Sequence, residues 1–215
     1  MQRILILGAN GKTAQIVIGR LLSETDDQLV LYLRNSQRLA RYANQQRVTI
    51  IDGDVQEMDK LQNAMRNIDV VYSNIGGVQL GEATQGILEA MEATSRKRLV
   101  FYSALGAEHE VPGRFGEWNE QAIADFLPGF RAAAKLIEQT SAVVTTQIRP
   151  AWLTDNDEIN YELTHKNELF KGTEVSRQSV ADFVVTILKN PDQYQNDSIG
   201  LNKPGTDGDQ PSWLA

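Results

Sequence analysis

Near its amino terminus the chain reads Arg3-Ile4-Leu5-Ile6-Leu7-Gly8-Ala9-Asn10-Gly11-Lys12-Thr13-Ala14. The apolar run predicts a strand that ends at Gly8, and the residues from Lys12 onward predict a helix. Gly8 permits a tight turn, Gly11 lets the backbone approach a bound group without a Cβ in the way, and Ala14 lets the helix pack close to the sheet. A helix that begins here would point free N–H groups at an anion. The alternative is a plain structural turn.

The rest of the chain alternates apolar runs with segments of helical periodicity. Nearly continuous apolar runs are typical of parallel strands that are covered on both faces. Strands are expected over residues 3–7, 29–33, 48–51, 70–73, 99–103 and 143–148. Helices are expected over residues 12–23, 36–44, 56–66, 81–94 and 178–190, with one longer helix within 118–139. This alternation predicts an α/β fold, a Rossmann-type doubly wound parallel sheet flanked by helices.

The domain organisation is expected to be simple. A chain of 215 residues suits one domain, which we place at residues 1–202. Residues 151–173 are polar and predict irregular structure. Residues 203–215 contain two prolines and two glycines and predict a flexible tail, a small C-terminal extension of the domain.

Composition narrows the classes of function. The net charge of −7 argues against a nucleic-acid partner, which would favour a basic surface. The chain has no cysteine, and its two histidines, His109 and His165, lie far apart, so no metal site is expected. The amino terminus lacks the features of a signal peptide, and no apolar window is long enough to cross a bilayer. We therefore expect a cytoplasmic protein that does not bind membranes.

The end of the second strand indicates which dinucleotide the glycine turn would serve. NAD-selective sites place an Asp or Glu there, but residues 28–51 contain no acidic side chain. Arg34 instead follows the strand, with Ser36 and Arg38 close behind, and a guanidinium suits a 2′-phosphate. NADP(H) is therefore preferred over NAD(H), which stays as the alternative, as does a solvated loop arginine. Lys12 is not a P-loop lysine, because that motif's spacing is absent.

Several motifs in order carry a family resemblance. They are Gly8-Ala9-Asn10-Gly11-Lys12-Thr13-Ala14, Arg34, Gly53-Asp54-Val55, Ser73-Asn74-Ile75-Gly76-Gly77, Phe101-Tyr102-Ser103, Lys135, Ile148-Arg149-Pro150 and Ser176-Arg177 before Val180-Ala181. Over about the first 190 residues the chain resembles an atypical short-chain dehydrogenase/reductase of the small NAD(P)H-binding, NmrA-like group.

The resemblance implies a set of cofactor contacts. Asp54 would meet the adenine amino group, Val55 would pack on the ring, and the backbone at Pro150 would meet the nicotinamide. Lys135 would hold the nicotinamide ribose. The full set of expected cofactor-binding residues is Gly8, Asn10, Gly11, Lys12, Thr13, Arg34, Asp54, Val55, Asn74, Ile75, Gly76, Lys135 and Pro150. The alternative for Asp54 and for Gly76 is a plain turn. The alternative for Pro150 is a strand end without a role in binding, and for Lys135 it is a solvated side chain.

The expected catalytic set is Ser103, Arg131 and Lys135, and it departs from the family pattern. Active members carry a Tyr four residues before the helix Lys, and here Arg131 stands at that position. An arginine cannot act as an acid at neutral pH, so Arg131 could only bind an anion or stabilise developing negative charge. Ser103 would donate a hydrogen bond to substrate, or else tie down backbone at the strand end.

Two functions follow from these residues. The first is an oxidoreductase that transfers hydride from NADPH to a small quinone or carbonyl acceptor at a site lacking the usual Tyr. The second is a non-catalytic NADP(H)-binding redox sensor or regulatory module. Phe115, Trp118 and Trp152 are candidates for a substrate pocket. The expected partner is a small molecule, and the sequence is compatible with a homo-oligomer. An epimerase or dehydratase is less favoured, because few residues follow Pro150.

Overall fold

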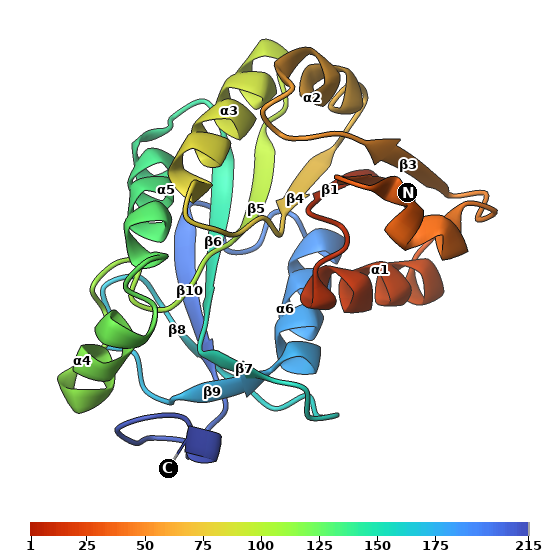
Figure 1. Cartoon of the computed structure of the whole chain (residues 1–215). Coiled ribbons are helices and arrows are strands. Elements are labelled where there is room, and N and C mark those ends of the chain that lie inside the picture. The colour runs from red at the N-terminus through yellow and green to blue at the C-terminus, as the bar shows by residue number, and fades with distance from the viewer. Residues whose placement is uncertain (215) are drawn as a thin grey trace.

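The structure is a computed structural model that describes residues 1–214. One eight-stranded sheet runs through the molecule. Its strands are β1 (Arg3–Leu7), β2 (Gln28–Leu33), β3 (Val48–Asp52), β4 (Val70–Ser73), β5 (Arg98–Tyr102), β6 (Val144–Pro150), β8 (Glu162–Thr164) and β10 (Asp197–Asn202). They lie in the order β3-β2-β1-β4-β5-β6-β10-β8, and only β8 is antiparallel to its neighbour. Figure 1 shows β4, β5 and β6 side by side at the centre of the sheet. β7 (Trp152–Thr154) and β9 (Glu174–Ser176) pair separately. The predicted parallel α/β sheet is confirmed.

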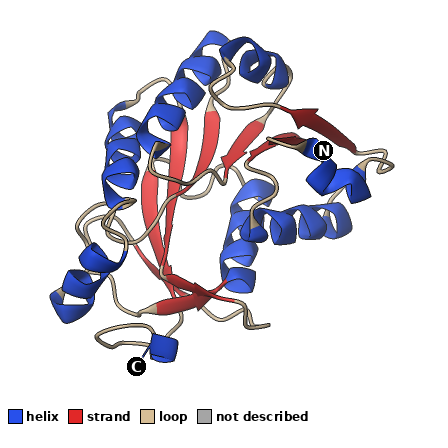
Figure 2. Ribbon diagram, viewed as in Figure 1, coloured by secondary structure: helices blue, strands red, loops and turns tan. Residues whose placement is uncertain are grey.

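Helices cover both faces of the sheet (Figure 2). One face carries α1 (Lys12–Glu24), α6 (Arg177–Lys189) and the 3₁₀-helix η1 (Ser36–Tyr42). The other carries α2 (Met58–Ala64), α3 (Leu80–Ala93) and α5 (Leu127–Gln139). The helix α4 (Gly113–Ala122) packs near β7, and the short η2 (Ser212–Leu214) lies beside β9.

The apolar runs of the inner strands are continuous because these strands bury side chains on both faces. In β1, Ile4 and Ile6 pack into the core under α1 and α6. Leu5 and Leu7 pack into the core under α2, α3 and α5. Successive side chains of a strand point to opposite faces, so a strand such as β1, which lies between two helix layers, is apolar on both faces.

The long helix expected within residues 118–139 is two helices, so that prediction was wrong. α4 ends at Ala122 and α5 begins at Leu127. Pro128 stands in the first turn of α5. Proline has no N–H to donate and clashes with the carbonyl of a preceding turn, so it is tolerated at the start of a helix and breaks a continuous one.

The carboxyl-terminal third holds more structure than its sequence suggests. The stretch expected to be irregular contains β7 and β8, and β10 adds an unpredicted parallel strand beside β6. In the expected tail, Lys203 pairs with Glu158 at 2.9 Å and Ser212 N donates to the Glu174 carboxylate at 2.9 Å. The mobility of this tail stays a prediction, and Ala215 lies outside the described residues.

Candidate functional site

A cavity of about 510 Å³ lies at the carboxyl ends of β1, β2, β3 and β4. This is the edge where β1 and β4 are neighbours and the winding of the sheet reverses, the place where ligands bind in folds of this kind. Its volume is in the range of small-molecule sites. It is lined by Gly8, Asn10, Gly11, Tyr32, Leu33, Arg34, Arg38, Gly53, Asp54, Val55, Gln56, Asn74, Ile75, Gly76, Gly77, Val78, Gln79, Leu80 and Ala83.

The glycine turn packs tightly against the end of β4. Gly8 has a φ of +70°, and a Cβ there would lie 2.8 Å from the carbonyl oxygen of Asn74. A Cβ on Gly11 would lie 2.2 Å from the Asn74 Nδ2 atom. The Asn74 amide is held in turn, because its Oδ1 atom accepts a hydrogen bond from the Tyr72 hydroxyl at 2.8 Å. Side chains at these two glycines would therefore close the floor of the cavity.

The first turn of α1 faces this floor with unsatisfied backbone donors. Gly11 is the N-cap residue and has no side chain that could accept a hydrogen bond from the helix. The residues that follow, Lys12, Thr13 and Ala14, bring no carboxylate to the first turn. The positive end of the helix dipole is therefore available to an anion. These features fit the diphosphate of a dinucleotide.

The far wall of the cavity carries two arginines. Arg34 and Arg38 both line it, and the Arg34 side chain is 83% exposed, with Nη1 3.6 Å from Asp54 Oδ2. The Tyr32 hydroxyl donates to the Asp54 carbonyl oxygen at 2.8 Å and fixes the turn after β3. Burial, helped by nearby carboxylates, raises the pKa of Tyr32 to about 12, so its hydroxyl stays a donor.

Most of the expected cofactor-binding residues line this cavity. Those at the glycine turn and at the ends of β2, β3 and β4 meet there, namely Gly8, Asn10, Gly11, Arg34, Asp54, Val55, Asn74, Ile75 and Gly76. Lys12 and Thr13 begin α1 beside it, and Pro150 ends β6 as a buried residue. Sequence reasoning missed Tyr32, Gly53 and the segment from Gly77 to Ala83. Gly53 carried a signal, because a glycine straight after a strand marks a close approach, and a Cβ there would meet the Tyr32 hydroxyl at 2.4 Å.

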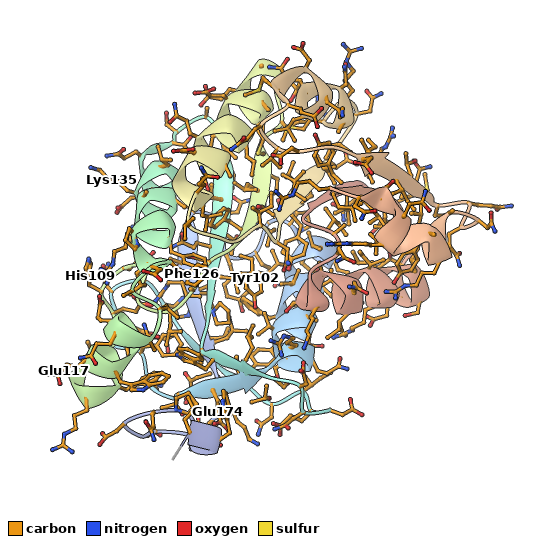
Figure 3. All side chains as sticks on the ribbon, viewed as in Figure 1. Tyr102, His109, Glu117, Phe126, Lys135 and Glu174 are labelled. Carbon is orange, nitrogen blue, oxygen red and sulfur yellow. The ribbon has the colours of Figure 1, made fainter. Side chains whose placement is uncertain are left out.

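The expected catalytic residues are not gathered in one place. Ser103 is buried just after β5, its N–H donates to the Ile148 carbonyl at 2.7 Å, and its Oγ atom has no hydrogen-bond partner within residues 1–214. Arg131 pairs with Glu120 and donates to the Gly106 carbonyl at 3.2 Å. Lys135 is exposed on the outer side of α5, well away from Tyr102 at the end of β5 (Figure 3).

A buried ion pair holds the loop that follows Ser103. Arg149 of β6 is fully buried, and its Nη1 atom lies 2.6 Å from Glu110 Oε1. The Glu110 carboxylate also accepts the N–H groups of Gly106 and Glu108, each at 3.0 Å. Arg149 donates to the Ser198 hydroxyl as well, at 2.8 Å. Glu108 adds a second link, because its carboxylate accepts a hydrogen bond from Gln147 of β6 at 2.6 Å, so two carboxylates fasten the loop to β6.

The three aromatic residues singled out above form one cluster. The Phe115 and Trp118 rings stack with centroids 6.0 Å apart, and Trp118 lies 4.8 Å from Trp152. The indole N–H of Trp152 donates to Asn119 Oδ1 at 3.0 Å. The cluster joins α4 to β7, close to the end of β6.

The chain belongs to the NAD(P)H-binding family, whose match covers residues 8–191. A short-chain dehydrogenase/reductase from Veillonella parvula DSM 2008, solved in complex with NADP, is 31% identical, with a TM-score of 0.92 over 98% of this chain and 99% of that chain. A Rossmann-fold NAD(P)-binding family protein from Shigella flexneri is 39% identical, with a TM-score of 0.83 over 98% of each chain. The resemblance to short-chain dehydrogenases/reductases is confirmed.

The chain is also similar in sequence to a fungal oxidoreductase. Oxidoreductase nsrR from Aspergillus novofumigatus is 29% identical over 102 residues, which are 42% of this chain and 38% of that protein. The matched part is less than half the length of that relative. Within residues 1–214, the helices are too short or too polar to cross a membrane.

Proposed function

We propose that the chain binds NADP(H) in preference to NAD(H) and transfers hydride from NADPH to a small quinone or carbonyl acceptor. The observation that carries this proposal is the cavity itself, which unites the glycine turn with Arg34 and Arg38 at the end of β2. A diphosphate at the turn would leave the adenosine ribose beside these arginines, whose guanidinium groups pair with phosphate through several donors. The NADP bound to the Veillonella relative supports the same cofactor.

The cofactor would be held from end to end by residues of this chain. The turn from Gly8 to Thr13 would bind the diphosphate, and Asp54 and Val55 would meet the adenine. Asn74, Ile75 and Gly76 would line the middle. Pro150 and Lys135 stay as the proposed contacts of the nicotinamide end, although Lys135 is exposed on the outer side of α5 in this structure. When bound, NADPH supplies the hydride.

Ser103 is the proposed donor to the acceptor oxygen, because its Oγ atom is buried and unpartnered among residues 1–214. The Arg131 guanidinium is already paired with Glu120 and donates to the Gly106 carbonyl. Its proposed effect on the reaction is therefore indirect, because it holds the loop after β5 in place. This chemistry suits a quinone best, since a quinone accepts hydride without an obligatory protein acid close by.

One observation favours the second candidate function, a redox sensor that binds NADP(H) without turnover. Arg131 is engaged by Glu120 and Lys135 lies exposed outside the cavity, so the pair expected on one face of α5 does not face the site. The two functions share the binding step and differ in whether hydride leaves the cofactor.

The test measures binding and turnover in the same sample. NADPH and NADH are titrated into the wild type, Arg34→Ala and the control Arg41→Ala, following nicotinamide fluorescence. Arg41 lies in η1, shortly after Arg34 in the chain, but its guanidinium donates to Gln15 Oε1 at 2.6 Å and it is not among the residues that line the cavity. Arg34→Ala should weaken NADPH about tenfold, because an exposed charge-assisted contact contributes about 1.4 kcal/mol, and should leave NADH unchanged.

Equal losses for both cofactors in Arg34→Ala would contradict the proposed preference. A quinone is then added to the NADPH complex. Quinone-dependent loss of the NADPH signal supports the oxidoreductase, and tight binding without turnover supports the sensor.

A further inference from the structure

A carboxylate bridges two cations beside the glycine turn. Asp155, which follows β7, lies 3.1 Å from Lys12 Nζ through one oxygen and 2.6 Å from Arg177 Nη1 through the other. Lys12 is the first residue of α1 and Arg177 the first residue of α6. Three segments far apart in the sequence therefore meet at one anion.

The two cations stand at the position where an anion is expected. Lys12 begins the helix whose first turn is uncapped. The N-terminus of α6 is capped by the Ser176 side chain, which accepts the Ser179 N–H at 2.9 Å, and the Arg177 guanidinium, which can only donate, takes no part in that cap. Arg177 keeps only 20% of its side chain exposed, whereas Asp155 keeps 66%, so the carboxylate is the more easily moved partner.

A separate buried donor stands at the end of β5, where the charge of Arg177 acts on it. The Tyr102 hydroxyl at the end of β5 is buried, and its oxygen has no hydrogen-bond partner in the described part of the chain. Burial raises the pKa of Tyr102 to about 12, while Thr13 and the charge of Arg177 lower it. A buried unpaired donor is costly, so a ligand with several acceptor oxygens would satisfy this site better than one carboxylate does.

We infer that Lys12 and Arg177 are the cationic ligands of the cofactor diphosphate, and that Asp155 is a displaceable counter-ion that neutralises them until the diphosphate arrives. This inference rests on the proposed function. A diphosphate carries more charge and more acceptor atoms than one carboxylate, so it displaces the Asp155 carboxylate from Lys12 and Arg177. The exposed Asp155 pairs are individually weak, which makes their loss on binding cheap.

Asp155 therefore competes with the cofactor diphosphate for Lys12 and Arg177. Lys12 lowers the pKa of Asp155 through a hydrogen bond, so the competing carboxylate is ionised at neutral pH. Removing its charge should free both cations in advance. The gain should be the same for NADPH and NADH, because the two share the diphosphate and differ only at the 2′ position.

The experiment compares Asp155→Asn with Asp157→Asn, which makes the same charge change two residues further along the same loop. Dissociation constants for NADPH, NADH and inorganic pyrophosphate are measured by nicotinamide fluorescence and by competition. Asp155→Asn should tighten all three by about threefold to tenfold, and Asp157→Asn should stay within about twofold of the wild type. Without ligand, the Tm of Asp155→Asn should not rise, whereas its ligand-induced rise in Tm should exceed that of the wild type.

Two results would overturn the inference. Equal affinities in Asp155→Asn and Asp157→Asn would mean that only general charge matters, and weaker binding in Asp155→Asn would mean that Asp155 helps to hold the cofactor. If the wild type binds neither dinucleotide but Asp155→Asn still gains pyrophosphate affinity, the anion exchange stands and the proposed function fails.

Discussion

Replacement of Arg149 by methionine should destabilise the protein far more than replacement of a surface arginine. Arg149 is fully buried and pairs with Glu110, which is itself only 7% exposed. Methionine fills similar space but leaves the Glu110 carboxylate buried without its cation. Breaking a buried pair from one side costs about 3–5 kcal/mol.

The structure places the expected loss toward the lower end of that range. Glu110 keeps two backbone N–H donors, from Gly106 and Glu108, after the guanidinium is gone. We expect a loss of about 3 kcal/mol in the free energy of unfolding. For a chain of this size that corresponds to a fall in Tm of roughly 6–12 °C.

The assay is urea unfolding followed by circular dichroism, with thermal unfolding alongside. The control is Arg114→Met, because Arg114 is 81% exposed and within residues 1–214 pairs only with Asp209, at 3.4 Å, so its loss should stay within about 0.5 kcal/mol. Adding Glu110→Gln to Arg149→Met removes the stranded charge and should recover at least about 1 kcal/mol. The reasoning is refuted if Arg149→Met costs no more than Arg114→Met, or if the double variant is as unstable as the two single losses combined.

Two further predictions concern the cavity and the buried phenols. Gly11→Ala should weaken NADPH and NADH at least about tenfold while the protein stays folded, because its Cβ would meet Asn74 Nδ2 at 2.2 Å. Gly19→Ala, where a Cβ meets no described atom within 4 Å, should bind normally and gain up to about 1 kcal/mol of stability. Fluorescence titration measures the cofactor affinity of both variants, and urea unfolding measures their stability. A Gly11→Ala variant with wild-type cofactor affinity would contradict the argument that the backbone must approach the cofactor closely at Gly11. The raised pKa values of Tyr32 and Tyr102, both about 12, mean that the folded state keeps protons which the unfolded state loses near pH 10. Their stabilisation should therefore be complete below pH 10 and vanish toward pH 12, with tyrosinate absorbance rising together with unfolding. Phenols that all ionise near pH 10 in a folded protein would contradict this expectation.

One geometric rule explains why residues that were chosen from the sequence as cofactor contacts line one cavity. Parallel strands end at the same edge of a sheet, so residues that follow successive strands must meet. Gly8, Arg34, Asp54 and Asn74 each follow a different strand and all line the cavity. The rule needs only strand ends, and continuous apolar runs mark these clearly.

The helix residues were harder to place because a helix has several faces. Arg131 and Lys135 share a face by spacing, but spacing does not say where that face points. In α5, Ala133, Ala134 and Ile137 are the buried side, so Lys135 is left outside. Only packing against α3 and the sheet fixes that rotation.

Long-range ion pairs could not be predicted from the sequence, for another reason. Arg149 stands in a strand that is buried along almost its whole length, and its partners Glu108 and Glu110 come from a loop about forty residues earlier. Asp155 is separated from Lys12 by 143 residues. Charge patterns along the chain cannot pair such residues without the topology that brings them together.

The lining of the cavity runs from Gly8 to Ala83, so its walls come from the first two fifths of the chain. Ser103, Arg131 and the aromatic cluster all come later. Substitutions at these later residues leave the sequence of the cavity lining unchanged, but α5 packs directly on that lining, since a Cβ on Gly129 would lie 2.7 Å from the carbonyl oxygen of Val78. A change of reaction partner made around Ser103 or the aromatic cluster would therefore spare the lining residues themselves, whereas a bulkier side chain at Gly129 would push against the wall from behind.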